Sequence, residues 1–265
     1  MSKARSRALH RAIGGAAALL LGLAAHQAAA QDYAREARWK DEVLGNLVVG
    51  DEVELALASG RQFLGLYTEG RPGEPAVLLV HGIGVHPDHG VIGILRGALA
   101  DMGFATLSIQ MPVLAADAQG PDYFPKLFPE ASERIAAGHA WLRGKGHENV
   151  VLASHSLGAW MSQYHLENLG GQAPGKGASF AAWVAMGRSG PLGEPSKIGM
   201  PVLDVYGERD LPAVLASAAE RQKTVKALPG SRQQVIAGAD HFYTNQEQKL
   251  AGVIRDFLGA LPSGR

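Results

Sequence analysis

The residues best suited to chemistry are Ser154-His155-Ser156-Leu157-Gly158, which follow directly on the apolar run Val150-Val151-Leu152-Ala153. This junction predicts a buried strand, a tight turn and a helix in succession. A serine on such a turn is presented as a nucleophile when the flanking positions are small enough for strand and helix to approach closely. Ser154 stands where the usual pattern has glycine, a mild departure that adds only a hydroxymethyl group. We therefore predict that Ser156 is an acyl-transfer nucleophile; the alternative is an ordinary strand-to-helix turn.

A nucleophilic serine needs a base to take its proton and a carboxylate to orient that base. Residues 201–207 are typical of a buried strand that ends at a glycine, and Asp210 lies in the loop that follows. A second strand-like run, residues 233–237, leads into His241. We predict that His241 is the base and that Asp210 is the acid.

Three other carboxylates lie close to these positions in the sequence. Glu208 also follows the strand end, Asp204 lies within the strand, and Asp240 precedes the histidine. We expect Asp204 to point into the sheet packing. Asp240 would have to fold back awkwardly to reach the ring of its own neighbour, which favours Asp210.

The negative oxygen formed in acyl transfer is usually stabilised by two backbone amides, one just after the nucleophile and one in the loop after the third strand. Residues 76–80 form a continuous apolar run followed by His81-Gly82-Ile83-Gly84. The N–H groups of Leu157 and Ile83 are therefore the predicted oxyanion donors. Glycine at 82 and 84 lets the loop adopt positive φ and lets a substrate oxygen approach the backbone.

The strand, turn, acid and histidine, in this order, resemble the α/β-hydrolase superfamily over roughly residues 50 to 261. More narrowly, residues 81–88, Leu95-Arg96 and residues 106–112 resemble an exported bacterial subgroup described only as a domain of unknown function. The resemblance implies the fold and a triad of Ser156, Asp210 and His241. It implies no substrate, because many unrelated chemistries share one fold.

The remaining pattern supports an α/β fold with a mostly parallel eight-stranded sheet and helices on both faces. Alternating polarity around Ser59-Gly60 predicts a hairpin over residues 52–58 and 61–68. Continuous apolar strands are expected near 76–81, 104–109, 149–154, 178–186, 201–206 and 231–237. Helices are expected near 32–46, 91–102, 130–145, 157–169, 213–227 and 245–260. The connection from residue 188 to 200 is too short for a large cap domain.

Substrate contacts are predicted from the loop of residues 112–129, which contains Tyr123, Phe124 and four prolines, and from His155 beside the nucleophile. The loop could equally be a peripheral apolar patch, and His155 could have a packing role.

Other histidines suggest alternatives that we weigh less. His81, His86 and His89 with Asp88 raise the question of a metal site, but their spacing matches no zinc motif. We expect instead a rigid turn that braces the oxyanion loop, with Asp88 held by Arg96. His139, His147 and His165 are interpreted as surface residues, and neither a metal nor a cofactor is expected.

The first thirty residues are typical of a secretory signal peptide. Four basic residues and no acidic one precede an apolar stretch, residues 12–25, and Ala28-Ala29-Ala30 offers a cleavage site. We expect three segments: a signal peptide at 1–30, a peripheral segment at 31–49 and a hydrolase domain at 50–265. Residues 31–265 hold 21 basic and 25 acidic residues, a net charge of −4. This balance gives no electrostatic reason to bind nucleic acid or anionic membranes.

Cysteine is absent, so neither a disulfide nor a lipid-modified cysteine is available. We expect an exported, periplasmic or secreted protein with no stable membrane anchor. The predicted function is a serine hydrolase of the carboxylesterase type, acting on a small-molecule or lipid-like ester. The alternatives are a non-catalytic envelope or binding protein on the same scaffold, and an acyltransferase or peptidase that uses the same triad.

Overall fold

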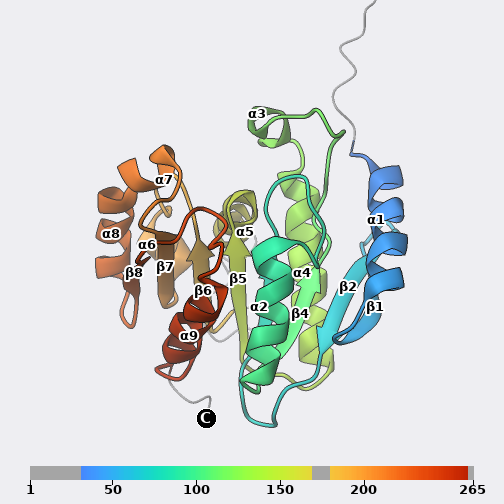
Figure 1. Ribbon diagram of the computed structural model, residues 1–265, viewed down its shortest axis with the longest axis horizontal. Coiled ribbons are helices and arrows are strands. Elements are labelled where there is room, and N and C mark those ends of the chain that lie inside the picture. Colours follow the sequence, from blue (N-terminus) through green and yellow to red (C-terminus); the bar gives the residue numbers. More distant parts are fainter. Residues whose placement is uncertain (1–30, 169–179, 262–265) are drawn as a thin grey trace, which may run out of the picture. The chain divides into compact units, whose positions relative to one another are not determined.

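An eight-stranded sheet organises the described residues, 31–168 and 180–261, of the computed structural model (Figure 1). The predicted signal peptide lies outside these residues. The strand order is β1-β2-β4-β3-β5-β6-β7-β8. The strands are β1 Asp51–Ala56, β2 Gln62–Thr68, β3 Ala76–Val80, β4 Ala105–Ile109, β5 Val150–His155, β6 Ala182–Met186, β7 Val202–Gly207 and β8 Arg232–Ile236.

Strands β1 and β2 form the predicted hairpin, and Gly60 turns the chain with a φ of 82°. Strand β2 pairs antiparallel with β4, and all later neighbours pair parallel. Strands β3, β4, β5 and β6 are buried at every position, as a parallel sheet covered on both faces requires. The predicted mostly parallel eight-stranded sheet is therefore confirmed.

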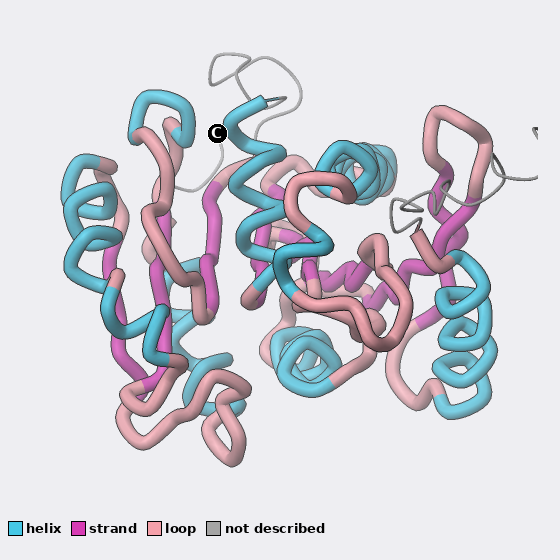
Figure 2. Tube along the Cα trace, turned by 90° about the horizontal axis from the view of Figure 1, so that it is seen from above, coloured by secondary structure: helices cyan, strands magenta, loops and turns pink. Residues whose placement is uncertain are grey.

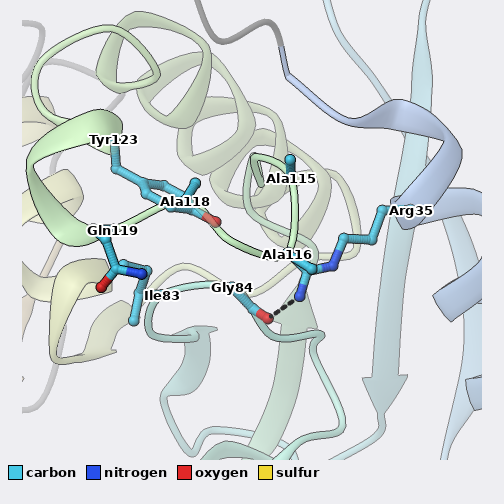
Figure 3. Close-up of a pocket in the computed structure, with 8 residues that line it drawn as sticks. All are labelled: Arg35, Ile83, Gly84, Ala115, Ala116, Ala118, Gln119 and Tyr123. Carbon is cyan, nitrogen blue, oxygen red and sulfur yellow. Dashed lines mark hydrogen bonds between the residues drawn. The ribbon is translucent and has the colours of Figure 1, made fainter.

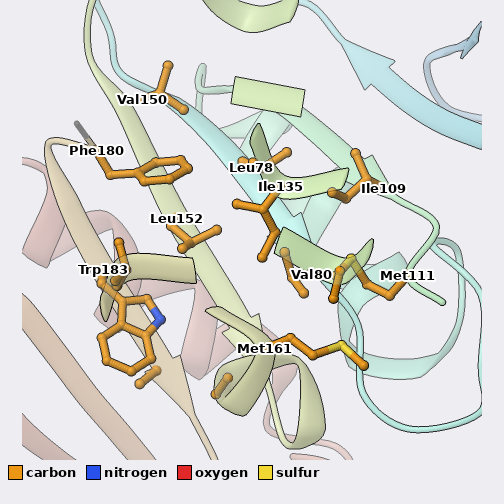
Figure 4. Packing of buried hydrophobic residues seen from close by; sticks show 14 of the residues in the cluster. Leu78, Val80, Ile109, Met111, Ile135, Val150, Leu152, Met161, Phe180 and Trp183 are labelled. Atoms are coloured by element: carbon orange, nitrogen blue, oxygen red, sulfur yellow. The ribbon is translucent and has the colours of Figure 1, made fainter. Parts of the chain in front are cut away.

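Helices cover both faces of this sheet (Figure 1). The longer ones are α1 Tyr33–Asn46, α2 Gly90–Asp101, α4 Phe128–Gly144, α5 Leu157–Asn168, α8 Ala218–Ala227 and α9 Glu247–Leu258, and the short ones are α3 Gly120–Tyr123, α6 Pro195–Ile198 and α7 Pro212–Ala216. One core cluster packs α2 and α9 against Val77 and Leu79 of β3. The other packs α4 and α5 against Leu78 and Val80, because alternate residues of a strand face opposite sides (Figure 4).

Helix α1 packs on the antiparallel side of the sheet. Val43 is buried against Leu64 and Leu66 of β2. Asp32 caps the helix by accepting a hydrogen bond from the backbone N–H of Arg35. Its own N–H donates to the carbonyl of Val113, so the start of α1 is joined to the loop after β4.

Several details differ from the sequence-based expectation. The helix expected over 213–227 is two helices, α7 and α8, which meet at Ser217; the Ser217 hydroxyl donates to the Ala213 carbonyl and accepts from the Gly190 N–H. His139 and His165 are buried, not on the surface, and both pack against Phe180.

The histidine prediction was wrong because polar partners make burial possible. His165 shares a hydrogen bond with the hydroxyl of Ser132 on the neighbouring helix. His147 is half-buried, and its Nε2 lies 3.0 Å from the Tyr67 hydroxyl.

The carboxyl ends of the parallel strands meet at one edge, which Figure 2 views from above. The loops after β3, β4, β5, β7 and β8 all begin at this edge. Within residues 31–168 and 180–261, no helix has both the length and the apolar character needed to span a bilayer. Ligand sites in open α/β sheets form at this edge, so the fold directs attention to these loops.

Candidate active site

Ser156 occupies the turn between β5 and α5 with a φ of 54°, in the left-handed region that side chains other than glycine rarely adopt. Its backbone N–H donates to the carbonyl of Met186, which holds the turn against the neighbouring strand. The residue is half-buried. A strained turn that presents a serine at a strand end is the geometry of a nucleophile elbow.

The small residues around Ser156 have identifiable reasons. A Cβ at Gly158 would lie 2.4 Å from the carbonyl oxygen of His81, so only glycine lets α5 start this close to the end of β3. Ser154, which replaces the usual first glycine, is fully buried, and its hydroxyl accepts a hydrogen bond of 2.8 Å from the indole N–H of Trp183. The departure from the pattern is therefore accommodated by a buried polar contact.

His241 lies beside Ser156 although 85 residues separate them in the sequence. Its Nε2 is 2.9 Å from the Ser156 Oγ, and its Nδ1 is 2.6 Å from the Asp210 Oδ1. Gly187 leaves room for this ring, since a Cβ there would lie 3.0 Å from the imidazole. The structure thus brings the three predicted side chains into one hydrogen-bonded chain.

Asp210 is held by its own loop as well as by the histidine. Its carboxylate accepts from the N–H groups of Gly207 and Leu211. Burial alone would raise the pKa of Asp210, but the hydrogen bond and charge of His241, with the two backbone donors, outweigh it and hold the pKa below its usual value. The Asp210 carboxylate is therefore ionised at the pH values at which His241 takes a proton and needs a negative partner.

The other three carboxylates have different partners. Asp204 is fully buried in β7 and forms a two-oxygen contact of 2.9 Å with the guanidinium of Arg221. Glu208 accepts from the N–H of Gly238, and Asp240 accepts from backbone N–H groups of the turn that follows it. None of these contacts is with the His241 ring, so Asp210 alone among the four is in place to orient it.

His155 lies under the histidine loop. Its Nε2 is 2.8 Å from the His241 carbonyl oxygen, and the two rings are 4.9 Å apart. Burial lowers the pKa of His155 to about 4, so the ring is neutral and can donate its Nε2 hydrogen to that carbonyl. These contacts position the backbone of His241. The predicted substrate contact of His155 stays a prediction.

The loop after β3 lies against the serine. A Cβ at Gly82 would be 3.4 Å from the Ser156 Cβ. In the described part of the chain, the N–H groups of Ile83 and Leu157 donate no hydrogen bond. His81 braces this loop. Burial lowers its pKa to about 3, so the neutral ring donates from Nδ1 to the Gly82 carbonyl and accepts at Nε2 from the Met111 N–H.

The turn after this loop is braced as the sequence predicts. Arg96 is buried, and its Nε donates to Asp88 at 2.7 Å. His86 accepts from the Asp88 N–H at 3.3 Å and packs against His89. The contacts of these residues therefore explain them as a structural turn.

Residues 112–129 contribute to a pocket of about 250 Å³ beside this loop (Figure 3). Tyr123 is buried and lines the pocket, whereas Phe124 is half exposed and packs edge-on against Phe128 and Trp160. The complete lining is Arg35, Ile83, Gly84, Ala115, Ala116, Ala118, Gln119 and Tyr123.

Arg35 is the lining residue that the sequence analysis missed, because it comes from α1, which we expected to be peripheral. Its guanidinium donates to the carbonyls of Leu114 and Gly84. The charged, amphipathic sequence of residues 32–46 predicts the helix but not the loops against which it packs.

Comparisons with known proteins agree with this architecture. A Pyrococcus furiosus esterase has a TM-score of 0.61 at 16% identity, over 82% of this chain and 97% of its own. A dienelactone hydrolase from Anabaena variabilis gives 0.59 at 19% identity, over 80% and 98%. A Xanthomonas campestris protein described as an α/β serine hydrolase without lid gives 0.56 at 15% identity, over 82% and 98%.

The chain therefore has the α/β-hydrolase fold, and residues 31–168 and 180–261 contain no large cap. Its residues 16–131 match the family described as "Protein of unknown function (DUF3530)". No relative was found among curated proteins.

Proposed function

We propose that the chain is a serine hydrolase that cleaves a carboxylic ester through an acyl-enzyme. The observation that carries this proposal is the continuous contact from Ser156 Oγ to His241 Nε2 and from His241 Nδ1 to Asp210 Oδ1, at 2.9 and 2.6 Å. Nucleophile, base and orienting acid at such distances are the parts that acyl transfer requires. The hydrolase fold of the structural neighbours supports the same class.

In this mechanism the Ser156 oxygen attacks the ester carbonyl while His241 Nε2 takes the hydroxyl proton. The imidazolium that forms is stabilised by ionised Asp210. His241 then gives the proton to the departing alcohol, and the acyl group stays on Ser156. Water attacks this second ester with His241 again as base, which releases the acid and restores the serine.

The oxyanion of each tetrahedral intermediate would be held by the N–H groups of Ile83 and Leu157. Gly82 brings the Ile83 loop against the serine, and no acceptor in the described residues competes for either amide. Donors that are already in place need no reorganisation when the charge develops, which is the main source of their catalytic effect.

The surroundings of the site favour a substrate with an apolar portion. Five large apolar residues in the connections at this edge of the sheet, four in loops and Leu215 in α7, are exposed by 38–63%: Ile83, Phe124, Leu211, Leu215 and Phe242. We therefore propose a small-molecule or lipid-like ester as substrate, with His155, Tyr123 and Phe124 as the predicted contacts. Nucleic acid is not among the proposed partners, since residues 31–265 carry a net charge of −4.

We also propose that the protein is exported, periplasmic or secreted. The proposal rests on the basic start, the apolar stretch and the Ala28-Ala29-Ala30 site of residues 1–30. Fractionation of cells that express the full chain, with N-terminal sequencing of the product, tests it. A product in the cytoplasm that retains Met1 or Ser2 would contradict it.

The test of the catalytic proposal is covalent labelling. The protein without residues 1–30 and its Ser156→Ala variant are incubated with a fluorophosphonate probe and analysed by mass spectrometry. We expect one adduct, on Ser156, in the unmodified protein and none in the variant, together with hydrolysis of 4-nitrophenyl butyrate that only the unmodified protein catalyses. A folded protein without an adduct would favour a non-catalytic binding protein instead.

A further inference from the structure

The pocket beside the oxyanion loop is lined mostly by small and apolar residues, with a cation at one side (Figure 3). Ile83, the predicted oxyanion donor, is part of its wall. Gly84, also in the wall, is two residues from Gly82, which lies against Ser156, and two residues of chain span at most about 7 Å. The wall of this pocket therefore begins within a short chain length of Ser156.

Arg35 brings a positive charge that no described carboxylate neutralises. Its guanidinium donates to the carbonyls of Leu114 at 2.8 Å and Gly84 at 3.2 Å, which use two of its five N–H groups. The ion pairs of the described residues include none with Arg35, whereas Arg134 nearby contacts two carboxylates. The nearest acid in sequence, Asp32, accepts from the backbone N–H of Arg35 rather than from its side chain.

The guanidinium is also fixed in orientation. It lies over the ring of Trp39, 4.3 Å from the centroid, and the two carbonyl acceptors belong to different loops. A fixed guanidinium is suited to planar, two-oxygen ligands, which it can bind with parallel hydrogen bonds.

Tyr123 supplies a second donor on the opposite wall. The residue is 1% exposed, its oxygen accepts from the Leu114 N–H at 3.1 Å, and among the described residues its own proton has no acceptor. The hydroxyl lies 3.6 Å from the Cβ position of Gly84, the residue whose carbonyl receives Arg35. A buried O–H and a guanidinium without an ion-pair partner thus both line a cavity whose other lining residues are three alanines, Ile83, Gly84 and Gln119, none of them acidic.

We propose that this pocket binds a carboxylate of the substrate, so that the preferred substrates are esters that carry a free carboxylate, such as half-esters of short dicarboxylic acids. The inference rests on the proposed ester hydrolysis and names the substrate class for that site. It also gives α1 a function, because the helix delivers the anion-binding residue.

The first test compares matched esters. The charged substrate is 4-nitrophenyl hydrogen glutarate, and the neutral one is its methyl ester of equal chain length. A second pair, 4-carboxyphenyl and 4-(methoxycarbonyl)phenyl butyrate, carries the charge on the leaving group instead. We expect kcat/KM for the charged member of at least one pair to exceed that of the neutral member by tenfold or more, beyond their ratio of uncatalysed hydrolysis rates.

Variants then test whether Arg35 and Tyr123 cause the preference for the charged ester. Arg35→Gln should lower the charged-to-neutral ratio at least tenfold, and Tyr123→Phe should lower it several-fold through the loss of one donor. Arg38→Gln, an exposed arginine on the same helix, is the matched control and should keep the original ratio and rates. Because Arg35 also holds Gly84, a purely structural role would reduce both rates by one factor; an unchanged ratio in Arg35→Gln would overturn the proposal.

A binding measurement distinguishes the proposed anion site from the proposed ester hydrolysis. Calorimetry with glutarate on the Ser156→Ala variant should detect binding that Arg35→Gln weakens at least tenfold. If neither ester is hydrolysed but glutarate binding depends on Arg35, ester hydrolysis fails and the anion site stands. If the esters are hydrolysed without preference and glutarate does not bind, the anion site fails and the hydrolase stands.

Discussion

The assignment of Asp210 can be tested against the three carboxylates that compete with it in the sequence. Asp210→Asn removes the negative charge opposite His241 Nδ1 and keeps the shape of the side chain. The N–H groups of Gly207 and Leu211 donate to different oxygens of Asp210, so the amide of asparagine keeps an acceptor for one of them, and we expect a folded protein whose thermal midpoint falls by a few degrees. The variant should therefore separate catalysis from folding.

The size of the effect follows from the charge that Asp210 offers to the imidazolium. Two unit charges about 4 Å apart interact by about 4 kcal/mol at an effective dielectric constant of ~20. Because each 1.4 kcal/mol is tenfold in rate, the loss in kcat is about 10³-fold, and a wrong tautomer of His241 adds to it. Since the pKa of Asp210 is held below its usual value, this difference should persist across the neutral range.

The assay is hydrolysis of 4-nitrophenyl butyrate, with the rate of fluorophosphonate labelling as a second measure. Glu208→Gln and Asp240→Asn are matched controls, since each removes one carboxylate charge near the site but none from the His241 ring. The kcat and the labelling rate of these two variants should stay within about tenfold of those of the unmodified protein. A folded Asp210→Asn variant that also stays within tenfold, or a control that loses as much as Asp210→Asn, would refute the reasoning.

Three further predictions concern stability and packing. Asp204→Ala leaves Arg221 buried without its partner and should lower the free energy of unfolding by about 3–5 kcal/mol in urea titrations, whereas exposed Asp256→Ala should change it by less than about 1 kcal/mol. Gly158→Val places a side chain 2.4 Å from the His81 carbonyl and should abolish labelling of Ser156, with a lower thermal midpoint; normal labelling would contradict the close approach. Burial lowers the pKa of both His155 and His165 from 6.5 to about 4. The unfolded chain therefore binds these protons first, and unfolding titrations should show stability falling between pH 6.5 and 4, by up to roughly 3 kcal/mol per histidine. His165→Gln should flatten that dependence, and an equal slope would argue against it.

The arrangement of the candidate triad follows from the sequence for a geometrical reason. Ser156, Asp210 and His241 each follow a segment predicted to be a strand, and parallel strands end at one edge of the sheet. Identifying these segments is then enough to expect the three side chains near one another. What they do is a separate question, which the labelling experiment addresses.

Buried polar residues on helices were harder to anticipate. Ser132 and His165 lie on the inward faces of α4 and α5, where apolar periodicity would place neither. The two side chains share a hydrogen bond of 2.8 Å. This bond offsets the free-energy cost of burying two polar groups, but it forms only when the two helices pack together. The sequence of either helix alone does not show that such a hydrogen bond will form between them. This is why we expected His165 to lie on the surface.

Arg35 illustrates the same limit at the site itself. Its two carbonyl partners lie 49 and 79 residues away, in loops whose mutual position is set by β3 and β4. The sequence predicts the helix that carries Arg35 but contains no information on which loops that helix meets. Such long-range contacts depend on where the loops lie and not on the nucleophile and its base. A common hydrolase fold therefore does not identify the substrate. Among the variants compared with the matched esters, Arg35→Gln should be measured first, because Arg35 carries the positive charge of the pocket.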